Sequence, residues 1–390
     1  MFAEKKCERC GTCLAECPYL ELSRETAKEE IVNLIKTRSI GKSLNNCIGC
    51  AYCNTLCPTQ SEPANLIREI NIKSICKHGL PGFYLPSDEI PLNLTSLALK
   101  IEPEIKEKSL KVYLNPPKSK EMFYLGCGLT YVYTDLLNTK LLDNIPKIGG
   151  IKYCCGSYIK MFGEEEVKIK GEAVLNDFKK LGVQKFILFC PGCLRMMVDF
   201  YSKLLPEFQD NFEFQTFSEY LVEKYHRDEL NIKTKIDERI TFHDPCAWRN
   251  LDPKIFEGPR ELLEIIGAEV VEMNHNRKKT LCCGSPVSDS DKELFERVSG
   301  MRILEAKEID VNSIAVSCTG CLALAKPSRK YNIETYHIIE LAQIAIGEKP
   351  PHRIIEVSEK FNKLIENTIN KNPDLLNQKY SIKNGKIKRV

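Results

Sequence analysis

Four short apolar runs in the middle and C-terminal parts of the chain each end close to a cysteine. They cover residues 122–125, 186–189, 240–242 and 314–316, and such continuous runs are typical of buried strands. Helical patterns follow them at 136–144, 171–181, 259–266 and 291–309. Strands that alternate with helices indicate parallel α/β units. Cysteines that follow such strands should therefore meet at one edge of a sheet.

The N-terminal part of the chain shows a different, purely helical pattern. Ile31, Leu34 and Ile35 have helical spacing within 21–40, and Ser23 is a plausible helix start. A second helical pattern covers 64–75, after which six prolines punctuate residues 79–117. We therefore place a domain boundary near Lys118.

The composition makes cysteine the informative residue type. The 390 residues include 19 cysteines, an odd number, so disulfides cannot pair all of them. The first residues contain no apolar stretch of the secretory kind. We therefore expect a reducing, cytoplasmic location, where clustered cysteines bind metal or carry out redox chemistry.

Charge and hydropathy narrow the range of partners. The 56 basic and 53 acidic residues leave a net charge of +3, spread along the chain, which argues against nucleic acid as a partner. No apolar run approaches the roughly 18 residues that a membrane span needs. We expect no direct membrane span, and any membrane association would come through a partner protein.

Eight cysteines near the N-terminus form two sets with one spacing. Each set reads C-x2-C-x2-C-x3-C-P, and every member of the second lies 40 residues after its counterpart. This spacing builds cubane 4Fe–4S clusters in which the fourth cysteine reaches the other cluster. The predicted ligands are Cys7, Cys10, Cys13 and Cys57, here called the first N-terminal set, and Cys47, Cys50, Cys53 and Cys17, the second N-terminal set.

Zinc knuckles are the alternative interpretation of these eight cysteines. Zinc sites close with four ligands and give no reason for a crossed fourth Cys-Pro, so the pattern favours iron–sulfur clusters. Gly11 and Gly49 lie where we expect the backbone to come close to inorganic sulfide, which favours a residue without Cβ.

Ten further cysteines form two copies of another pattern, a lone Cys, a Cys-Cys-Gly and a Cys-x-x-Cys. The interval from the adjacent pair to the next cysteine is 35 positions in both copies, from 155 to 190 and from 283 to 318. The first five-cysteine set is Cys127, Cys154, Cys155, Cys190 and Cys193, and the second five-cysteine set is Cys246, Cys282, Cys283, Cys318 and Cys321.

Five thiols per copy are more than a cubane cluster needs. Neighbouring side chains on an extended strand point to opposite faces, so the adjacent pair cannot easily bind one iron. A sharp turn at Gly156 or Gly284 would let the pair reach different irons of a larger or opened cluster. A vicinal disulfide is the alternative for the pair alone, but it does not explain the recurrent Cys-x-x-Cys downstream.

Together these motifs resemble a known family. The doubled pattern, with Cys154-Cys-Gly-Ser157, His243-Asp-Pro-Cys246 and Leu281-Cys-Cys-Gly-Ser285, resembles the cysteine-rich CCG domain of heterodisulfide reductases. The helical insert between the first eight cysteines resembles the α-helical ferredoxin domain of fumarate-reductase-type iron–sulfur subunits. The fusion of the two is similar to the single-chain iron–sulfur catalytic subunit of heterodisulfide reductase, over roughly residues 1 to 345.

The resemblance implies an oxidoreductase subunit with two cubane and two noncubane 4Fe–4S clusters. Each five-cysteine set would ligate one noncubane cluster, and a substrate disulfide would be cleaved between the two. After Cys246 the chain reads Ala-Trp-Arg-Asn, where the family usually has a polar or histidine residue and then Leu-Gly-Arg, so we expect substrate contacts near Trp248 and Arg249 to differ. Surface or packing roles are the favoured interpretation of Arg260 and Trp248, and a contribution to an anionic substrate pocket is the alternative.

Relatives with this architecture also serve as electron conduits to quinones in glycolate, lactate or glycerol-3-phosphate oxidation. A pure electron-transfer subunit of a flavin dehydrogenase, acyl-CoA reductase or quinone-linked complex, with no disulfide substrate, is therefore the second hypothesis. Under either hypothesis the chain lacks a recognisable nucleotide or flavin motif and belongs to a hetero-oligomeric complex, typical of anaerobic metabolism. Its expected partner is a flavoprotein, hydrogenase, dehydrogenase or membrane cytochrome subunit.

The expected fold is α+β or α/β. It has an α-helical ferredoxin domain (1–80), a connecting segment (81–117), a first CCG repeat (118–235), a second CCG repeat (236–348) and a polar C-terminal tail (349–390), with the repeats related by pseudo-twofold symmetry. The default expectation for the tail is that it is solvated, and packing on a neighbour is the alternative. Outside the cysteine sets, His243 is a candidate to donate a proton to a thiolate or a hydrogen bond to a cluster sulfur, with a structural role as the alternative. Cys76 belongs to no set, and we expect it to be a buried structural thiol.

Overall fold

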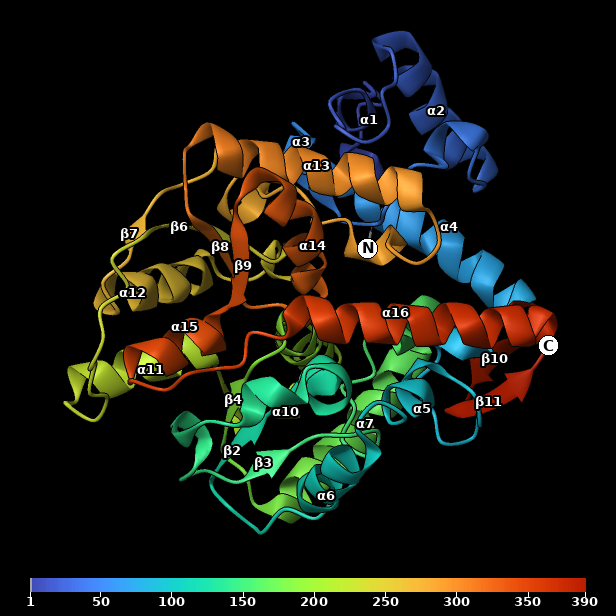
Figure 1. Ribbon diagram of the computed structural model, residues 1–390. Coiled ribbons are helices and arrows are strands. Elements are labelled where there is room, and N and C mark those ends of the chain that lie inside the picture. The colour runs from blue at the N-terminus through green and yellow to red at the C-terminus, as the bar shows by residue number, and fades with distance from the viewer. Residues whose placement is uncertain (1) are drawn as a thin grey trace.

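The structure is a computed structural model, which describes residues 2–390 (Figure 1). The N-terminal part is helical, with α1 (Thr12–Ala15), α2 (Arg24–Thr37), α3 (Tyr52–Leu56) and α4 (Pro63–His78). Helix α2 begins as predicted, because the Ser23 hydroxyl accepts a hydrogen bond from the Thr26 amide at 3.1 Å. Its buried face contains Ile31, Leu34 and Ile35, which pack into a small core shared with α4.

Two parallel sheets follow, as the apolar runs predict. The first contains β2 (Glu121–Tyr124), β3 (Lys147–Ile148), β4 (Lys185–Leu188) and β5 (Glu213–Thr216), in the order β3-β2-β4-β5. The second contains β6 (Arg239–His243), β7 (Glu269–Val270), β8 (Ser313–Val316) and β9 (Glu334–His337), in the order β7-β6-β8-β9. The mixed helical and parallel-sheet architecture is therefore confirmed. The equal strand order is what a duplication predicts, and pseudo-twofold symmetry stays a prediction.

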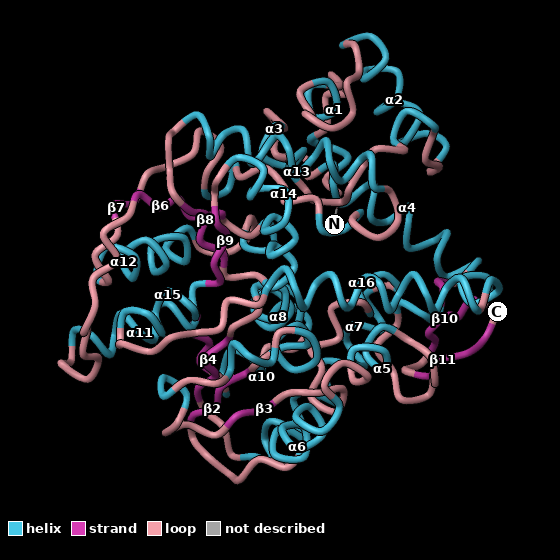
Figure 2. Tube along the Cα trace, viewed as in Figure 1, coloured by secondary structure: helices cyan, strands magenta, loops and turns pink. Residues whose placement is uncertain are grey.

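Helices connect the strands and cover the sheets (Figures 1 and 2). The longer ones are α7 (Glu164–Leu181), α11 (Phe217–His226), α12 (Glu257–Ile265), α13 (Lys292–Glu308) and α15 (Ile338–Ala345), and the short ones are α8 (Pro191–Arg195), α9 (Ser202–Leu204), α10 (Glu207–Asn211) and α14 (Ala325–Ser328). The helix predicted over 136–144 is wrong. Thr139 is extended there and its hydroxyl caps the Leu141 amide, which leaves only two 3-10 turns.

The two segments predicted as a connection and a tail are folded. The proline-rich connection contains α5 (Leu94–Ala98) and α6 (Pro103–Leu114). The prediction of a solvated tail is wrong. Helix α16 (Ile354–Lys371) buries Ile354, Val357 and Ile365, and the strands β10 (Lys379–Lys383) and β11 (Lys386–Arg389) follow it. Strand β10 pairs antiparallel with β1 (Leu80–Pro81), so the C-terminal end is attached to the end of the N-terminal part. The domain limits given above stay predictions.

Candidate metal centres

The eight N-terminal cysteines lie in two groups of neighbouring thiols, and their crossed assignment to two clusters stays a prediction. Burial, followed by the nearby thiols of Cys57, Cys7 and Cys10, raises the pKa of Cys13 to about 12. Burial likewise raises the pKa of Cys17 to about 11, with Cys50 and Cys47 as its neighbouring thiols. Each Cys-Pro cysteine therefore lies beside the set to which the crossing rule assigns it.

Gly11 and Gly49, the two glycines of these loops, have different surroundings. Both adopt a left-handed backbone, with φ of +78° at Gly11 and +67° at Gly49. A Cβ at Gly11 would lie 2.5 Å from the Lys28 backbone nitrogen, whereas no atom lies within 4 Å of one at Gly49. Gly11 thus permits the close packing of its loop on α2, and the proposed approach to inorganic sulfide stays a prediction at both positions.

The first five-cysteine set gathers at the carboxyl ends of β2 and β4. The Sγ atoms of Cys127 and Cys154 are 3.9 Å apart, and the thiol of Cys155 interacts with those of Cys154 and Cys193. Cys190 is in contact with Cys193 in turn. The adjacent pair is not a disulfide, since all nineteen cysteines are free. Gly156, at φ +69°, makes the expected turn and donates its amide to Cys154 Sγ at 3.4 Å.

The second five-cysteine set repeats this arrangement at β6 and β8. Its thiols form the same chain of contacts, in the order Cys246, Cys282, Cys283, Cys321 and Cys318. The Gly284 amide donates to Cys282 Sγ at 3.4 Å, and Gly284 has φ +84°. Contacts with the Cys282 and Cys321 thiols lower the pKa of Cys283 to about 5.

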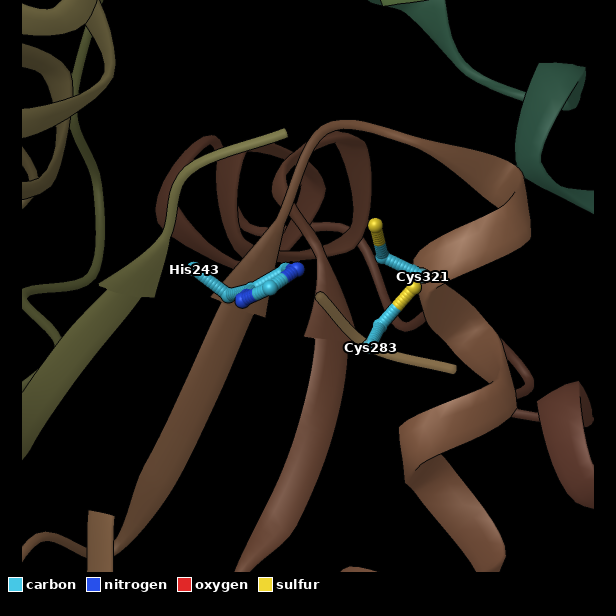
Figure 3. Close-up of side chains that lie close together, drawn as sticks. All are labelled: His243, Cys283 and Cys321. Atoms are coloured by element: carbon cyan, nitrogen blue, oxygen red, sulfur yellow. The ribbon is translucent and has the colours of Figure 1, made fainter. Parts of the chain in front are cut away.

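His243 lies directly at the second five-cysteine set. A ring nitrogen of His243 and the Sγ atoms of Cys283 and Cys321 lie within 4.8 Å of one another, and all three residues are buried (Figure 3). Arg302 donates from Nε to His243 Nδ1 at 2.9 Å, which leaves Nε2 as the protonated nitrogen of the neutral ring. Burial, helped by the Arg302 charge, lowers the pKa of His243 to about 3, so the ring is neutral near pH 7.

The two five-cysteine sets lie on elements that pack against each other at the boundary between the sheets. Helix α8, which carries Cys193, packs against the 3-10 turn Cys246–Trp248. The π-helical turn Gly128–Val132, which follows Cys127, packs against the 3-10 helix Thr319–Leu324. A Cβ added at Gly128 would lie only 2.0 Å from Thr319 Oγ1, so this contact is close. The fold therefore places the two thiol clusters on adjoining elements.

The donor chemistry of all four sets fits iron–sulfur clusters. Every set consists of thiols, the soft ligands that such clusters take, and the amides of Gly156 and Gly284 already point at sulfur. A Cβ at Gly126 would lie 2.7 Å from Cys190 Cβ and 3.4 Å from Cys193 Sγ, so a glycine keeps that side of the first five-cysteine set open.

Two protein families match the two parts of the chain that carry these cysteines. A 4Fe-4S dicluster domain matches residues 6–62, and a cysteine-rich domain matches residues 240–324. A subunit of dihydromethanophenazine:CoB–CoM heterodisulfide reductase from Methanosarcina mazei is 24% identical, over 87% of this chain and 93% of the relative. The chain is an iron–sulfur oxidoreductase subunit related to this heterodisulfide reductase component.

Other relatives are oxidoreductase subunits of different names. A probable glycolate oxidase iron-sulfur subunit from Bacillus subtilis is 25% identical, over 88% of this chain and 94% of the relative. A subunit of fumarate reductase (CoM/CoB) from Methanothermobacter marburgensis is 24% identical, over 88% of this chain and 72% of the relative. Within residues 2–390, no helix of this oxidoreductase subunit is both long and apolar enough to cross a bilayer.

The structure gives Arg260 and Trp248 the packing roles that the sequence favours, and it differs from the sequence prediction at Cys76. Arg260 is 5% exposed, and Asp244 accepts hydrogen bonds from both of its terminal nitrogens at 2.8 and 2.9 Å. Trp248 is buried and lines a small cavity together with Cys190. Cys76 is exposed rather than buried, with its thiol 3.3 Å from the Phe162 carbonyl oxygen.

The side chains that support the cysteines carry no motif that the sequence reveals. Tyr201 donates its hydroxyl to the Cys155 carbonyl at 2.5 Å, Arg302 holds His243, and Tyr19 accepts the Cys282 amide at 2.8 Å. These residues carry no spacing motif, and the contacts join positions 46 to 263 residues apart. Only Tyr19 had a local signal, since it follows Cys17-Pro18.

Proposed function

We propose that this chain reduces a disulfide with electrons that a redox partner protein delivers to its N-terminal domain. The observation that supports this most is the adjoining arrangement of the two five-cysteine sets, joined by the contacts of α8 with the Cys246–Trp248 turn and of Gly128 with Thr319. Two sites on adjoining elements suit a substrate with two sulfur atoms, each of which needs a site of its own once the bond between them breaks.

The ligand assignments are part of the proposal. The first and second N-terminal sets would hold two cubane 4Fe–4S clusters, and the two five-cysteine sets would hold two noncubane 4Fe–4S clusters. When bound, these clusters would supply the one-electron chemistry that a two-electron disulfide reduction requires. The equal strand order of the two sheets supports a duplicated, pseudo-twofold pair of repeats.

The other residues of the site would position these thiols and supply hydrogen bonds. His243 is held by Arg302 with its Nε2–H free, so it would donate a hydrogen bond to sulfur without releasing a proton near pH 7. Tyr201 and Tyr19 bond the backbone of Cys155 and Cys282, and so would fix the loops of the two adjacent pairs.

The test uses the full chain purified without oxygen. Four clusters predict about sixteen iron and about sixteen sulfide ions per chain. With a reduced viologen dye as electron donor and a heterodisulfide as acceptor, the chain should form two thiols per disulfide. Zinc in place of iron, or fewer than about twelve iron ions in reconstituted protein, would contradict the cluster assignment.

The second candidate is an electron-transfer subunit that binds no disulfide. It is favoured by the full-length similarity to a probable glycolate oxidase iron-sulfur subunit. In that case the chain would exchange electrons with a flavoprotein, hydrogenase, dehydrogenase or membrane cytochrome subunit within a hetero-oligomeric complex. No thiol formation from any disulfide, together with rapid electron exchange with a reduced flavoprotein, would decide for this function.

A further inference from the structure

The N-terminal domain meets the second five-cysteine set through its second N-terminal set. Tyr19, two residues after Cys17, accepts the Cys282 amide at 2.8 Å, and Arg297 on α13 donates to the Tyr19 carbonyl at 3.0 Å. Of the eight N-terminal cysteines, Cys17 and Cys50 pack against the large core of the two sheets, and both belong to the second N-terminal set. Cys7, Cys13, Cys47 and Cys53 pack in the separate N-terminal core, which Cys17 also contacts. The second N-terminal set is therefore the one that adjoins the sheets.

Arg249 lies buried at this junction. It comes three residues after Cys246, is 4% exposed, and donates from Nη2 to the Thr280 carbonyl at 2.7 Å, two residues before Cys282. Its guanidinium carbon lies 5.2 Å from the ring centre of Tyr52, which follows Cys50 by two residues. Arg249 thus contacts the loops of both the second N-terminal and the second five-cysteine sets.

The charge of Arg249 has no counterpart among residues 2–390. Its Nε and Nη1 atoms are buried and have no hydrogen-bond acceptor there, and it forms no ion pair with an acidic side chain there. A buried cation with unmade hydrogen bonds is costly unless an anion compensates it. Arg260 and Arg302, the other deeply buried arginines of this region, each pair with a carboxylate.

Two cysteines of these sets lie within reach of the Arg249 charge. They are Cys50 of the second N-terminal set and Cys246 of the second five-cysteine set, and the Arg249 charge favours the ionised form of each. The same positive charge therefore acts on one cysteine from each of the two sets, and a cluster with thiolate ligands would supply the anion that the buried guanidinium lacks.

We infer that Arg249 is the shared counter-ion of the second N-terminal set and the second five-cysteine set, and that its charge makes the clusters of both easier to reduce. The inference rests on the proposed function, since it needs clusters at both sets. Reduction adds one negative charge to a cluster, and a fixed buried cation favours the more negative state. Arg249 does not touch the substrate. It acts on the two cysteine sets through its fixed positive charge, and so is a positioning residue rather than a catalytic one.

The experiment compares Arg249→Gln, Arg249→Lys and the wild-type full chain in reductive titrations followed by EPR spectroscopy. In Arg249→Gln we expect the reduced-to-oxidised ratio of both clusters to fall about tenfold at a fixed potential. For a one-electron reduction this corresponds to a reduction potential that is about 59 mV more negative. The cluster of the first N-terminal set should not shift and is the internal standard. Arg249→Lys keeps the charge and should retain most of the wild-type ratio.

Arg329→Gln is the matched control. It removes an arginine that is 48% exposed, already paired with Glu334 and outside the contacts described above, so the cluster potentials should stay unchanged. Arg249→Gln with full iron content and unshifted potentials would overturn the inference, as would equal shifts in Arg249→Gln and Arg249→Lys. If Arg249→Gln loses iron from these two sets, retention in Arg249→Lys supports the charge role, and loss in both overturns it.

The outcomes separate this inference from the proposed function. If the wild-type chain binds four clusters and reduces a disulfide but Arg249→Gln has unchanged cluster potentials, only the inference about Arg249 is refuted. If the wild-type chain binds all four clusters but reduces no disulfide, only the proposed disulfide reduction is refuted, because the shift in cluster potential does not require a substrate. A chain without iron at these sets removes both.

Discussion

Gly128 and Thr319 lie at a contact between elements that carry the two five-cysteine sets, and Gly128→Ala tests this contact. A Cβ at position 128 would lie 2.0 Å from Thr319 Oγ1 and 2.6 Å from Thr319 Cβ. Ordinary carbon contacts need about 3.5 Å, so the two turns must separate by about 1 Å or more. Overpacking of this kind costs about 1–3 kcal/mol. A misplacement of about 1 Å between reacting groups reduces the rate by up to about 100-fold.

We therefore expect Gly128→Ala to keep its iron but to lose most of its disulfide reduction. The assay is thiol formation with a reduced dye, alongside iron analysis and thermal unfolding without oxygen. Thr319→Gly in the same chain removes the clashing atoms and should restore activity. Gly300→Ala on α13 is the control, because a Cβ there meets open space. Wild-type activity and stability in Gly128→Ala would refute the adjoining arrangement of the two sets.

Three further predictions concern stability and the unassigned cysteine. Arg260→Met leaves the fully buried Asp244 carboxylate without its bidentate partner and should lower the free energy of unfolding by about 3–5 kcal/mol in urea titrations; a loss under about 0.5 kcal/mol would contradict a buried pair. Hydrogen bonding to Glu340 raises the pKa of His352, so the stabilisation is complete below the unfolded value near 6.5 and disappears as pH rises through the folded value. His352→Asn should therefore lose more stability at about pH 6 than at about pH 8.5, and an equal loss at both would exclude a charged His352. Cys76→Ser should keep the wild-type iron content, because this thiol is exposed and outside every set, whereas Cys246→Ser should lose iron.

Local patterns in the sequence predicted much of the fold. The four apolar runs are strands, and the helical patterns at 21–40, 64–75, 171–181, 259–266 and 291–309 are helices, because periodicity and caps such as Ser23 act within a few residues. The predicted helix at 136–144 failed where one extended residue, Thr139, interrupts the pattern. The predicted tail failed because its buried partners, Phe83 and Leu97, lie more than 250 residues earlier in the chain.

The cysteine inventory was determined by the sequence alone, since spacing along the chain decides which thiols one short loop can present together. Tertiary structure decided how those sets are arranged: the two five-cysteine sets lie on adjoining elements, and the second N-terminal set lies against the second of them. It also decided that Arg249 has no carboxylate partner within residues 2–390 and that Arg302 holds His243. Such contacts join residues far apart in the chain, such as Tyr19 and Cys282 at a separation of 263, and arise only when separately folded elements pack.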